Sequence, residues 1–262
     1  MYPRNLHTHT WRCKHALGEP LDYCQPALAA GLRVLGFSDH APQPDDRWNH
    51  VHMESYEIDD YLEAIDIARK CYAGRLKVLS GFECEYRRDH HHYFADELRA
   101  KCDYLIGGAH WYPDPEHGEE WPCTFYDIRS PRDMRLFTNY TVEMISSGLF
   151  SFIAHPDVFA HSYFDWNADA EACCRDILQA AADCKVPLEL NALGFRRPPV
   201  ETPFGNRAPY PYLPFWELAA EYPVEVVCNS DAHQPEDIAG CLDQTWEIVQ
   251  RFNLRESRLF MD

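Results

Sequence analysis

The 262-residue sequence lacks any run of about 18 consecutive apolar residues, the length that a membrane-spanning helix needs. It also lacks an apolar signal region, because Arg4, His7 and His9 interrupt the first residues. We therefore expect no membrane partner and a cytoplasmic location. No internal linker or low-complexity segment divides the chain, which predicts one domain over residues 1–262.

Basic residues are few: 24 Lys and Arg stand against 42 Asp and Glu, and the formal net charge is −18. A field of this sign repels nucleic acid phosphates, so we expect no nucleic-acid partner. It also opposes anionic substrates, unless bound cations and local Arg side chains reverse the potential inside a cleft. No C-x-x-C pair occurs, and the odd number of 11 cysteines favours reduced thiols over a disulfide framework.

Strand-like and helix-like segments alternate along the whole sequence. Seven apolar runs have the pattern of strands, at residues 4–10, 34–38, 77–82, 104–109, 150–154, 186–191 and 224–229. Helical patterns separate them, at about 20–30, 55–73, 92–101, 131–147, 168–184, 215–222 and 236–251. Long loops are expected at 41–53, 112–130 and 198–214, and a short extra strand at 258–261 is optional.

Near-continuous apolar strands separated by helices indicate parallel strands that are buried on both faces. Seven such β-α units predict an α/β fold in the form of a closed or nearly closed β/α barrel. An open doubly wound sheet is the alternative, but its Gly-rich phosphate loop is missing.

Nearly every predicted strand ends in a residue type that binds metal ions. His7 and His9 are two positions apart, so an extended strand directs both imidazoles to one face. In a β/α barrel the carboxyl ends of the strands converge on one face, where the active site lies. The residues at these ends are His7, His9, Asp39, His40, Glu83, His110, His155, Asp231 and His233, and His15 lies in the first loop on the same side.

This set of side chains exceeds what one ion needs. A metal ion takes about four to six ligands, so the set predicts a centre with two or three ions. Imidazoles and carboxylates without a thiolate suit Zn, Mn or Fe and do not choose between them. Glu83 is the natural bridging carboxylate, whereas Asp39 is expected to orient a ligand imidazole. Close metal ions activate a bridging water and neutralise a highly charged transition state, which points to hydrolysis of a phosphate ester.

Six short motifs resemble the motif series of the polymerase-and-histidinol-phosphatase (PHP) superfamily. They are His7-x-His9, Ser38-Asp39-His40, Gly81-Phe82-Glu83, Gly108-Ala109-His110, Ala154-His155-Pro156-Asp157 and Ser230-Asp231-Ala232-His233. The resemblance implies a distorted seven-stranded (β/α)7 barrel with three metal ions at the C-terminal strand ends. Matched by motif, the first ion takes His7, His9, Glu83 and Asp231, the second takes Glu83, His110 and His155, and the third takes His15, His40 and His233.

The segment from Glu189 to Arg196 resembles the histidinol-phosphate phosphatase branch, which has an Asn, a Gly and then basic residues at its sixth strand. We therefore predict hydrolysis of L-histidinol phosphate, in histidine biosynthesis, by attack of a metal-bridging hydroxide. The predicted catalytic residues are Glu83, Asp231 and His233. The predicted substrate contacts are Asn191, Arg196, Arg197 and His161, the last in place of a basic residue that the branch usually has after the fifth strand. Extended backbone is expected at the two Arg residues, so that only Arg196 faces the site.

Three alternatives remain open. The first is a PHP-type phosphatase for another small ester, such as a sugar or nucleotide phosphate. The second is an editing or regulatory barrel that acts on nucleic acid, which the net charge of −18 and the lack of an extra domain disfavour. The third is a structural protein, which has no use for so many ligand residues. His50 and His52, with Trp48, are expected either to line the mouth of the site or to decorate a mobile loop. The oligomeric state is open.

Overall fold

The computed structural model describes residues 3–261. Two units make up the chain. The first holds the chain up to Ile106, the segment Asn229–Leu242 and the residues from Arg258 onward, and the second holds Gly107–Cys228 and Asp243–Ser257. The expectation of one domain over residues 1–262 stays a prediction.

Parallel strands form the core of the first unit, in the order β1-β2-β3-β4. Their bounds are Arg4–Asn5 for β1, Val34–His40 for β2, Lys77–Cys84 for β3 and Tyr104–Gly107 for β4. The register pairs Val34 with Lys77 at one end of β2 and His40 with Glu83 at the other. All seven residues of β2 are buried, as the near-continuous apolar run predicts.

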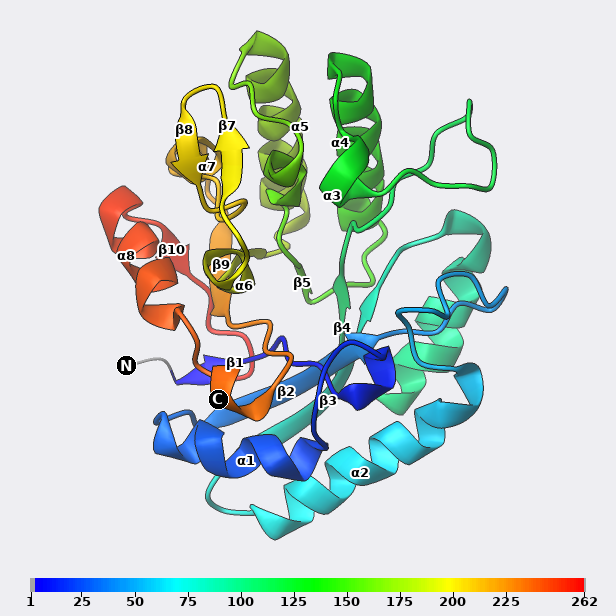
Figure 1. The fold of residues 1–262 in the computed structure, drawn as a ribbon. Coiled ribbons are helices and arrows are strands. Elements are labelled where there is room, and N and C mark those ends of the chain that lie inside the picture. Colours follow the sequence, from blue (N-terminus) through cyan, green and yellow to red (C-terminus); the bar gives the residue numbers. More distant parts are fainter. Residues whose placement is uncertain (1–2, 262) are drawn as a thin grey trace. The chain divides into compact units, whose positions relative to one another are not determined.

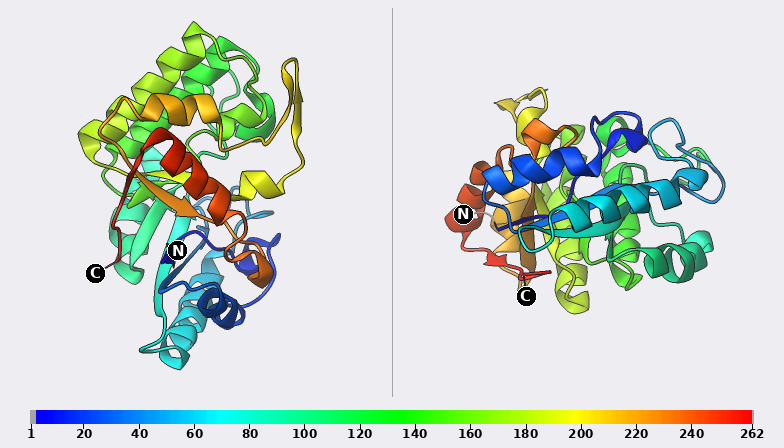
Figure 2. Two further views of the ribbon diagram at one scale, coloured as in Figure 1. Left: turned by 90° about the vertical axis from the view of Figure 1, so that its left-hand side faces the viewer. Right: turned by 90° about the horizontal axis from the view of Figure 1, so that it is seen from below.

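Helices α1, Pro20–Ala29, and α2, Ile58–Cys71, run side by side along these strands (Figures 1 and 2). Proline at the first position and a capping box between Glu19 and Asp22 start α1. Shorter helical turns lie at Trp11–Cys13, Ser55–Glu57, Arg88–His90, Tyr93–Leu98, Arg99–Lys101 and Pro235–Asp237.

Tyr104 ties the strands of the first unit together from inside. Its hydroxyl lies 2.7 Å from the carbonyl of Leu6 and 3.2 Å from that of Phe37. A Cβ atom at Gly36 would lie 2.3 Å from the tyrosine oxygen, and one at Gly81 would lie 2.7 Å from its ring. Both positions need glycine because the ring occupies that space.

The second unit has parallel strands in the order β5-β6-β9-β10, which span Phe152–Ile153, Leu188–Asn191, Glu225–Asn229 and Arg255–Glu256. A separate antiparallel hairpin joins β7, Val200–Thr202, to β8, Gly205–Arg207. The helices are α3 Thr124–Asp127, α4 Pro131–Ser146, α5 Ala168–Cys184, α6 Leu193–Arg196, α7 Leu213–Ala219 and α8 Leu242–Phe252, with a 3-10 turn at Val158–His161. Helices α4 and α5 lie side by side (Figure 2), and each begins at a side-chain cap, Ser130 or Asn167.

The predicted α/β class and the parallel direction of the strands are confirmed, while some boundaries are wrong. The helix predicted at 92–101 forms, as a π-helical segment at Tyr93–Leu98 followed by a 3-10 turn at Arg99–Lys101. The Tyr93 hydroxyl donates to the Pro42 carbonyl at 3.0 Å. The last helix begins at Leu242 because Cys241 has a left-handed φ of 58°. Among the described residues, every helix is too short or too polar to cross a lipid bilayer.

Asp114 attaches the 112–130 loop to the start of α4. Its two carboxylate oxygens each lie 2.7 Å from a guanidinium nitrogen of Arg132, and one also accepts from the backbone nitrogen of Glu116 at 2.9 Å. The hydrogen bonds from Arg132 lower the pKa of Asp114 to about 2. The pair therefore contributes stability that is fully present above the usual carboxyl pKa and is lost as the pH falls through about 2.

We expect Asp114→Asn to lower the thermal unfolding midpoint by about 2 °C at neutral pH, a modest effect because the guanidinium is partly exposed. The difference from wild type should shrink as the pH falls from 4 to 2. Calorimetry across this pH range measures it, and Glu120→Gln, an exposed change in the same loop, is the control. A difference that stays constant down to pH 2 would contradict the role of the ion pair.

Candidate metal centre

Asn5, the last residue of β1, joins two distant segments of the first unit. Its amide nitrogen donates to the hydroxyls of Thr8 and Ser230, both at 2.9 Å. Its amide oxygen accepts from the backbone nitrogen of Ser230 at 2.8 Å. These buried hydrogen bonds hold residues 5–9 beside residues 229–233, the two segments that carry predicted ligands.

The backbone continues this contact beyond β1. The nitrogen of His9 donates to the carbonyl of Ala232 at 2.9 Å, and the nitrogen of Ala232 donates to the carbonyl of His7 at 3.4 Å. Asp231 has a left-handed φ of 51°. Its carboxylate lies 3.1 Å from Nε2 of His9 and 3.6 Å from Nε2 of His7. Three of the four side chains predicted for the first ion are thus in contact.

Glu83, the fourth, places one carboxylate oxygen among three imidazoles. Oε2 lies 3.2 Å from Nε2 of His7, 3.5 Å from Nε2 of His9 and 3.2 Å from Nδ1 of His40. The parallel register of β2 and β3 sets His40 beside Glu83, and the glutamate is fully buried. An oxygen shared by several ligands is in the position that a bridging carboxylate needs.

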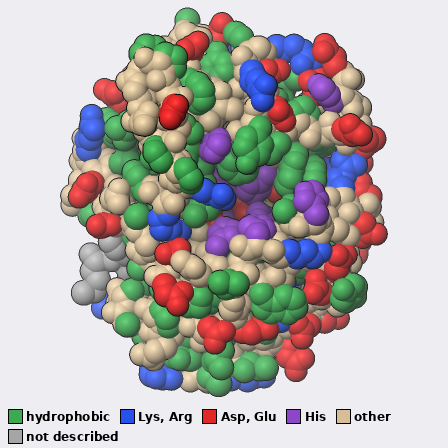
Figure 3. Space-filling view, viewed as in Figure 1, with side chains coloured by type: hydrophobic (Ala, Val, Ile, Leu, Met, Phe, Trp, Pro, Cys, Tyr) green, Lys and Arg blue, Asp and Glu red, His purple; other side chains and the backbone are tan. Residues whose placement is uncertain are grey.

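His15, His40 and His233 form a second ligand cluster in the first unit. One ring nitrogen of each lies within 4.8 Å of the others. Nδ1 of His15 lies 2.7 Å from the carbonyl of Cys13, and Nδ1 of His233 lies 3.1 Å from that of Asp231. Because a carbonyl only accepts, these contacts keep the proton on Nδ1 and leave Nε2 of both rings for a metal ion. Histidine side chains gather on the face drawn in Figure 3.

Asp39 lies behind the ligands. One oxygen is 3.4 Å from Nδ1 of His9, and the other accepts from the backbone nitrogen of Thr10 at 3.0 Å and from the Thr10 hydroxyl. The backbone nitrogen of Asp39 donates to the Tyr61 hydroxyl at 3.1 Å. A carboxylate held in this way orients an imidazole, which is the role that we expected.

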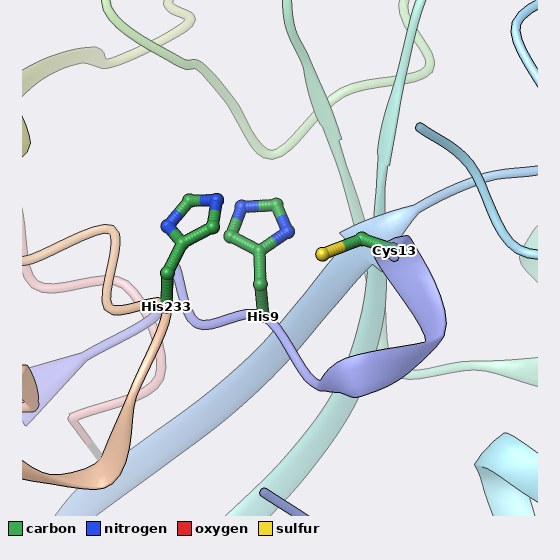
Figure 4. Close-up of side chains that lie close together, drawn as sticks. All are labelled: His9, Cys13 and His233. Atoms are coloured by element: carbon green, nitrogen blue, oxygen red, sulfur yellow. The ribbon is translucent and has the colours of Figure 1, made fainter. Parts of the chain in front are cut away.

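Cys13 is a residue that the sequence interpretation leaves out. Its thiol is fully buried and points toward a ring nitrogen of His9, while His233 lies on the other side of that ring (Figure 4). Burial raises the pKa of the thiol, and the charge of Asp39 adds to this effect. The thiol therefore keeps its proton in the metal-free protein. The available signal is its place in the loop between His9 and His15.

The cluster of His7, His9, Glu83 and Asp231 favours positive charge at its centre. Burial alone would raise the pKa of Asp231, but the charge of His7 and the hydrogen bond from His9 hold it well below its usual range. Burial alone would lower the pKa of His9, but its hydrogen bonds with Asp231 and Asp39 raise it well above its usual value. The Nε2 atoms of His7 and His9 face each other at 3.1 Å. Donors that converge this closely fit a divalent ion, because one cation serves several of them at once.

His110 and His155, the remaining predicted ligands, lie together in the second unit. Their ring centroids are 4.8 Å apart. His155 has a left-handed φ of 30°, and its backbone nitrogen donates to buried Glu189 at 3.0 Å. Asn191 donates to the same carboxylate oxygen at 2.9 Å. Glu189, which sequence reasoning does not single out, thus stabilises a backbone conformation that residues other than glycine rarely adopt.

Comparison with known proteins supports what the donor set suggests. The PHP domain family matches residues 5–192. The chain belongs to the PHP family. It is similar to a protein of Deinococcus radiodurans named "Probable histidinol-phosphatase", with 32% identity over 247 residues that cover 88% of this chain and 86% of that protein.

Two solved structures resemble most of the chain. HisK of Listeria monocytogenes has a TM-score of 0.71 at 18% identity, and the match covers 92% of this chain and 99% of that one. HisK of Lactococcus lactis, a histidinol phosphate phosphatase solved with Zn, L-histidinol and phosphate, has a TM-score of 0.71 at 15% identity, with coverage of 97% and 95%. At these identities the likeness concerns the fold alone, and it confirms the predicted β/α barrel class.

Two of the substrate contacts predicted for this PHP protein have local partners. Asn191 is fully buried, and its oxygen accepts from the backbone nitrogen of Leu193 at 2.8 Å. Nδ1 of His161 lies 2.7 Å from the carbonyl of Phe125. Burial lowers the pKa of His161, so a positive charge on this ring is disfavoured at neutral pH. Their contact with substrate stays a prediction.

The expectation of extended backbone at Arg196 is wrong. Arg196 ends helix α6, where its guanidinium donates to the carbonyl of Ala192 at 3.3 Å. The helical turn forms here because the Asn191 side chain satisfies the nitrogen of Leu193 at its start. Arg197 follows with extended backbone and is exposed.

Proposed function

We propose that this PHP protein is a metal-dependent phosphomonoesterase. The observation that carries the proposal is the convergence of His7, His9, Glu83 and Asp231, with carboxylate oxygens 3.1–3.6 Å from imidazole nitrogens. Bound divalent ions, whether Zn, Mn or Fe, supply a lowered pKa for water and positive charge against the developing charge of the phosphoryl group. The phosphatase name of the Deinococcus relative supports the same reaction class.

We propose a trinuclear centre. The side chains for the first ion are His7, His9, Glu83 and Asp231, and those for the third are His15, His40 and His233. Both sets lie within the first unit, which supports these two assignments. That His110 and His155 join Glu83 at the second ion stays a prediction from the motifs.

Asp231 and His233 act as ligands in this proposal rather than as proton donors. Burial and the nearby charge of His9 hold the pKa of His233 well below its usual value. The pKa of Asp231 is also well below its usual range, because His7 and His9 outweigh the effect of burial. Near neutral pH neither side chain carries an acidic proton to give to a leaving alkoxide. Coordination is therefore the role that we propose for both side chains. Their predicted role in proton transfer is weakened.

We propose L-histidinol phosphate as the substrate. A role in histidine biosynthesis and a cytoplasmic location stay predictions. The test is a panel of histidinol, sugar and nucleotide phosphates with Zn²⁺, Mn²⁺ or Fe²⁺. We expect the highest kcat/KM on histidinol phosphate. Activity confined to sugar or nucleotide phosphates would favour the alternative substrate class. A folded, metal-loaded protein that hydrolyses none of these esters would overturn the proposed function.

Arg196 is the cation that we propose for the substrate phosphate. A guanidinium matches the phosphate oxygens as a planar fork. We expect Arg196→Met to raise KM for histidinol phosphate at least ~10-fold, the loss of one charge-assisted contact of about 1.4 kcal/mol. Arg197→Met tests the other predicted arginine contact, at the exposed neighbour, in the same assay. Unchanged kinetics in both variants would remove Arg196 from the substrate site.

A further inference from the structure

A second buried acid–imidazole pair lies against the ligand His40. Glu85 follows β3 and stands two residues after Glu83. His52 comes from the 41–53 loop. Both side chains are fully buried, and Nε2 of His52 lies 3.3 Å from Oε2 of Glu85.

Both ring nitrogens of His52 face a polar atom. Nδ1 lies 2.8 Å from the carbonyl of Ala41, and Nε2 faces Glu85. The ring stacks on that of His40, with centroids 5.0 Å apart and planes inclined by only 8°. The edge of His40 faces Glu83, with Nδ1 at 3.2 Å from Oε2. One carboxylate thus lies at the edge of His40 and His52 lies parallel over its face, whereas the rings of His9 and His15 contact it at inclinations of 38° and 30°.

The backbone carbonyls of Glu83 and Glu85 also attach the 41–53 loop to the end of β3. The nitrogen of Ala41 donates to the carbonyl of Glu83 at 2.8 Å. The amide nitrogen of Gln43 donates to the carbonyl of Glu85 at 3.1 Å. The backbone that follows His40 is therefore fastened to β3 independently of the ion pair. Loss of the pair should leave this attachment in place and change mainly the ring contacts of His40.

We infer that His52 and Glu85 are a positioning pair that fixes the ring plane in which His40 binds its metal ion. A buried carboxyl and a buried imidazole carry a desolvation penalty that well-packed apolar side chains avoid, so packing alone does not explain the pair. Partners behind a ligand imidazole orient the ring and typically change metal affinity 10- to 100-fold. The inference rests on the proposed metal centre.

The test uses Glu85→Gln, which keeps the shape of the carboxylate and removes its charge, and His52→Phe, which keeps the stacked ring and removes both polar contacts. His50→Phe, an exposed change in the same loop, is the control. His40→Asn identifies the binding step that belongs to His40. Calorimetric titration of metal-free protein with Zn²⁺ and Mn²⁺ measures each step, and thermal unfolding of the metal-free variants reports stability separately.

We expect Glu85→Gln and His52→Phe to weaken the His40 step about 10-fold and to leave the other steps within twofold of wild type. The double variant should be no worse than the more affected single variant, because the two side chains act as one unit. Unchanged affinity for the His40 step, or equal weakening of all steps with a lower unfolding midpoint, would overturn the positioning role. A His40→Asn variant that binds every ion as wild type does would instead overturn the proposed metal assignment.

Discussion

Replacement of Glu83 by Gln is expected to lower kcat at least ~10³-fold and to release metal ion from the protein. One oxygen of Glu83 lies 3.2–3.5 Å from three ligand imidazoles, the position in which a carboxylate would bridge two ions. Gln keeps the size of the side chain and removes its negative charge. Two cations that share a neutral amide repel each other with less compensation, and at least one should bind weakly.

Elemental analysis and steady-state kinetics of the same preparations measure this effect. Glu63→Gln is the matched control, because Glu63 is exposed on α2 in the same unit. The thermal unfolding midpoint shows whether the variant is folded. A folded Glu83→Gln protein with wild-type metal content and rate would refute the bridging role.

The ligands on β2 and β3 are predictable from sequence because they end buried apolar runs. A run that is buried on both faces marks a parallel strand, and parallel neighbours end at the same edge of a sheet. The observed register sets His40 beside Glu83, as this rule requires. The information lies in the order and length of the runs, and no contact between distant residues is needed to read it.

The first strand shows where such reasoning stops. The pattern predicts a strand over 4–10, but β1 comprises only Arg4–Asn5. Beyond it the chain pairs through a single bridge between Thr8 and Ala232. The hydrogen bonds of Asn5 to Ser230 set up this pairing, and they join residues 225 positions apart. Local propensity does not encode a contact of that separation. This contact nevertheless decides how Asp231 meets His9.

Residues around the ligands were harder to predict than the ligands themselves. Cys13 and Glu189 contact predicted ligands but follow no spacing rule of their own. Buried His52 resembles exposed His50 in sequence, since both lie in one polar loop. Only tertiary structure separates them, because it places Glu85 against one ring and solvent against the other.

Removal of the metal ions with a chelator is expected to abolish turnover, and dialysis into Zn²⁺ or Mn²⁺ should restore it. Protein purified without chelator should contain two or three equivalents per chain, because the first unit alone offers two ligand clusters. The metal-free protein should remain folded, since the hydrogen bonds of Asn5 join its ligand segments without a metal ion. Circular dichroism and the thermal unfolding midpoint check that point, and phosphate release by the untreated enzyme is the reference.

The affinity for metal should also rise with pH. Although burial lowers it, the hydrogen bonds with Asp231 and Asp39 hold the pKa of the His9 imidazole well above its usual value, so the metal-free cluster carries a proton on His9 at neutral pH. A metal ion must displace that proton, and the apparent affinity of the His9 step should rise about tenfold per pH unit for each proton released, until the pH exceeds the raised pKa. Titrations at several pH values in buffers of different ionisation enthalpy count the protons. Affinity independent of pH would contradict the proton on His9. Full turnover by folded protein with one equivalent of metal or none would exclude the multinuclear centre.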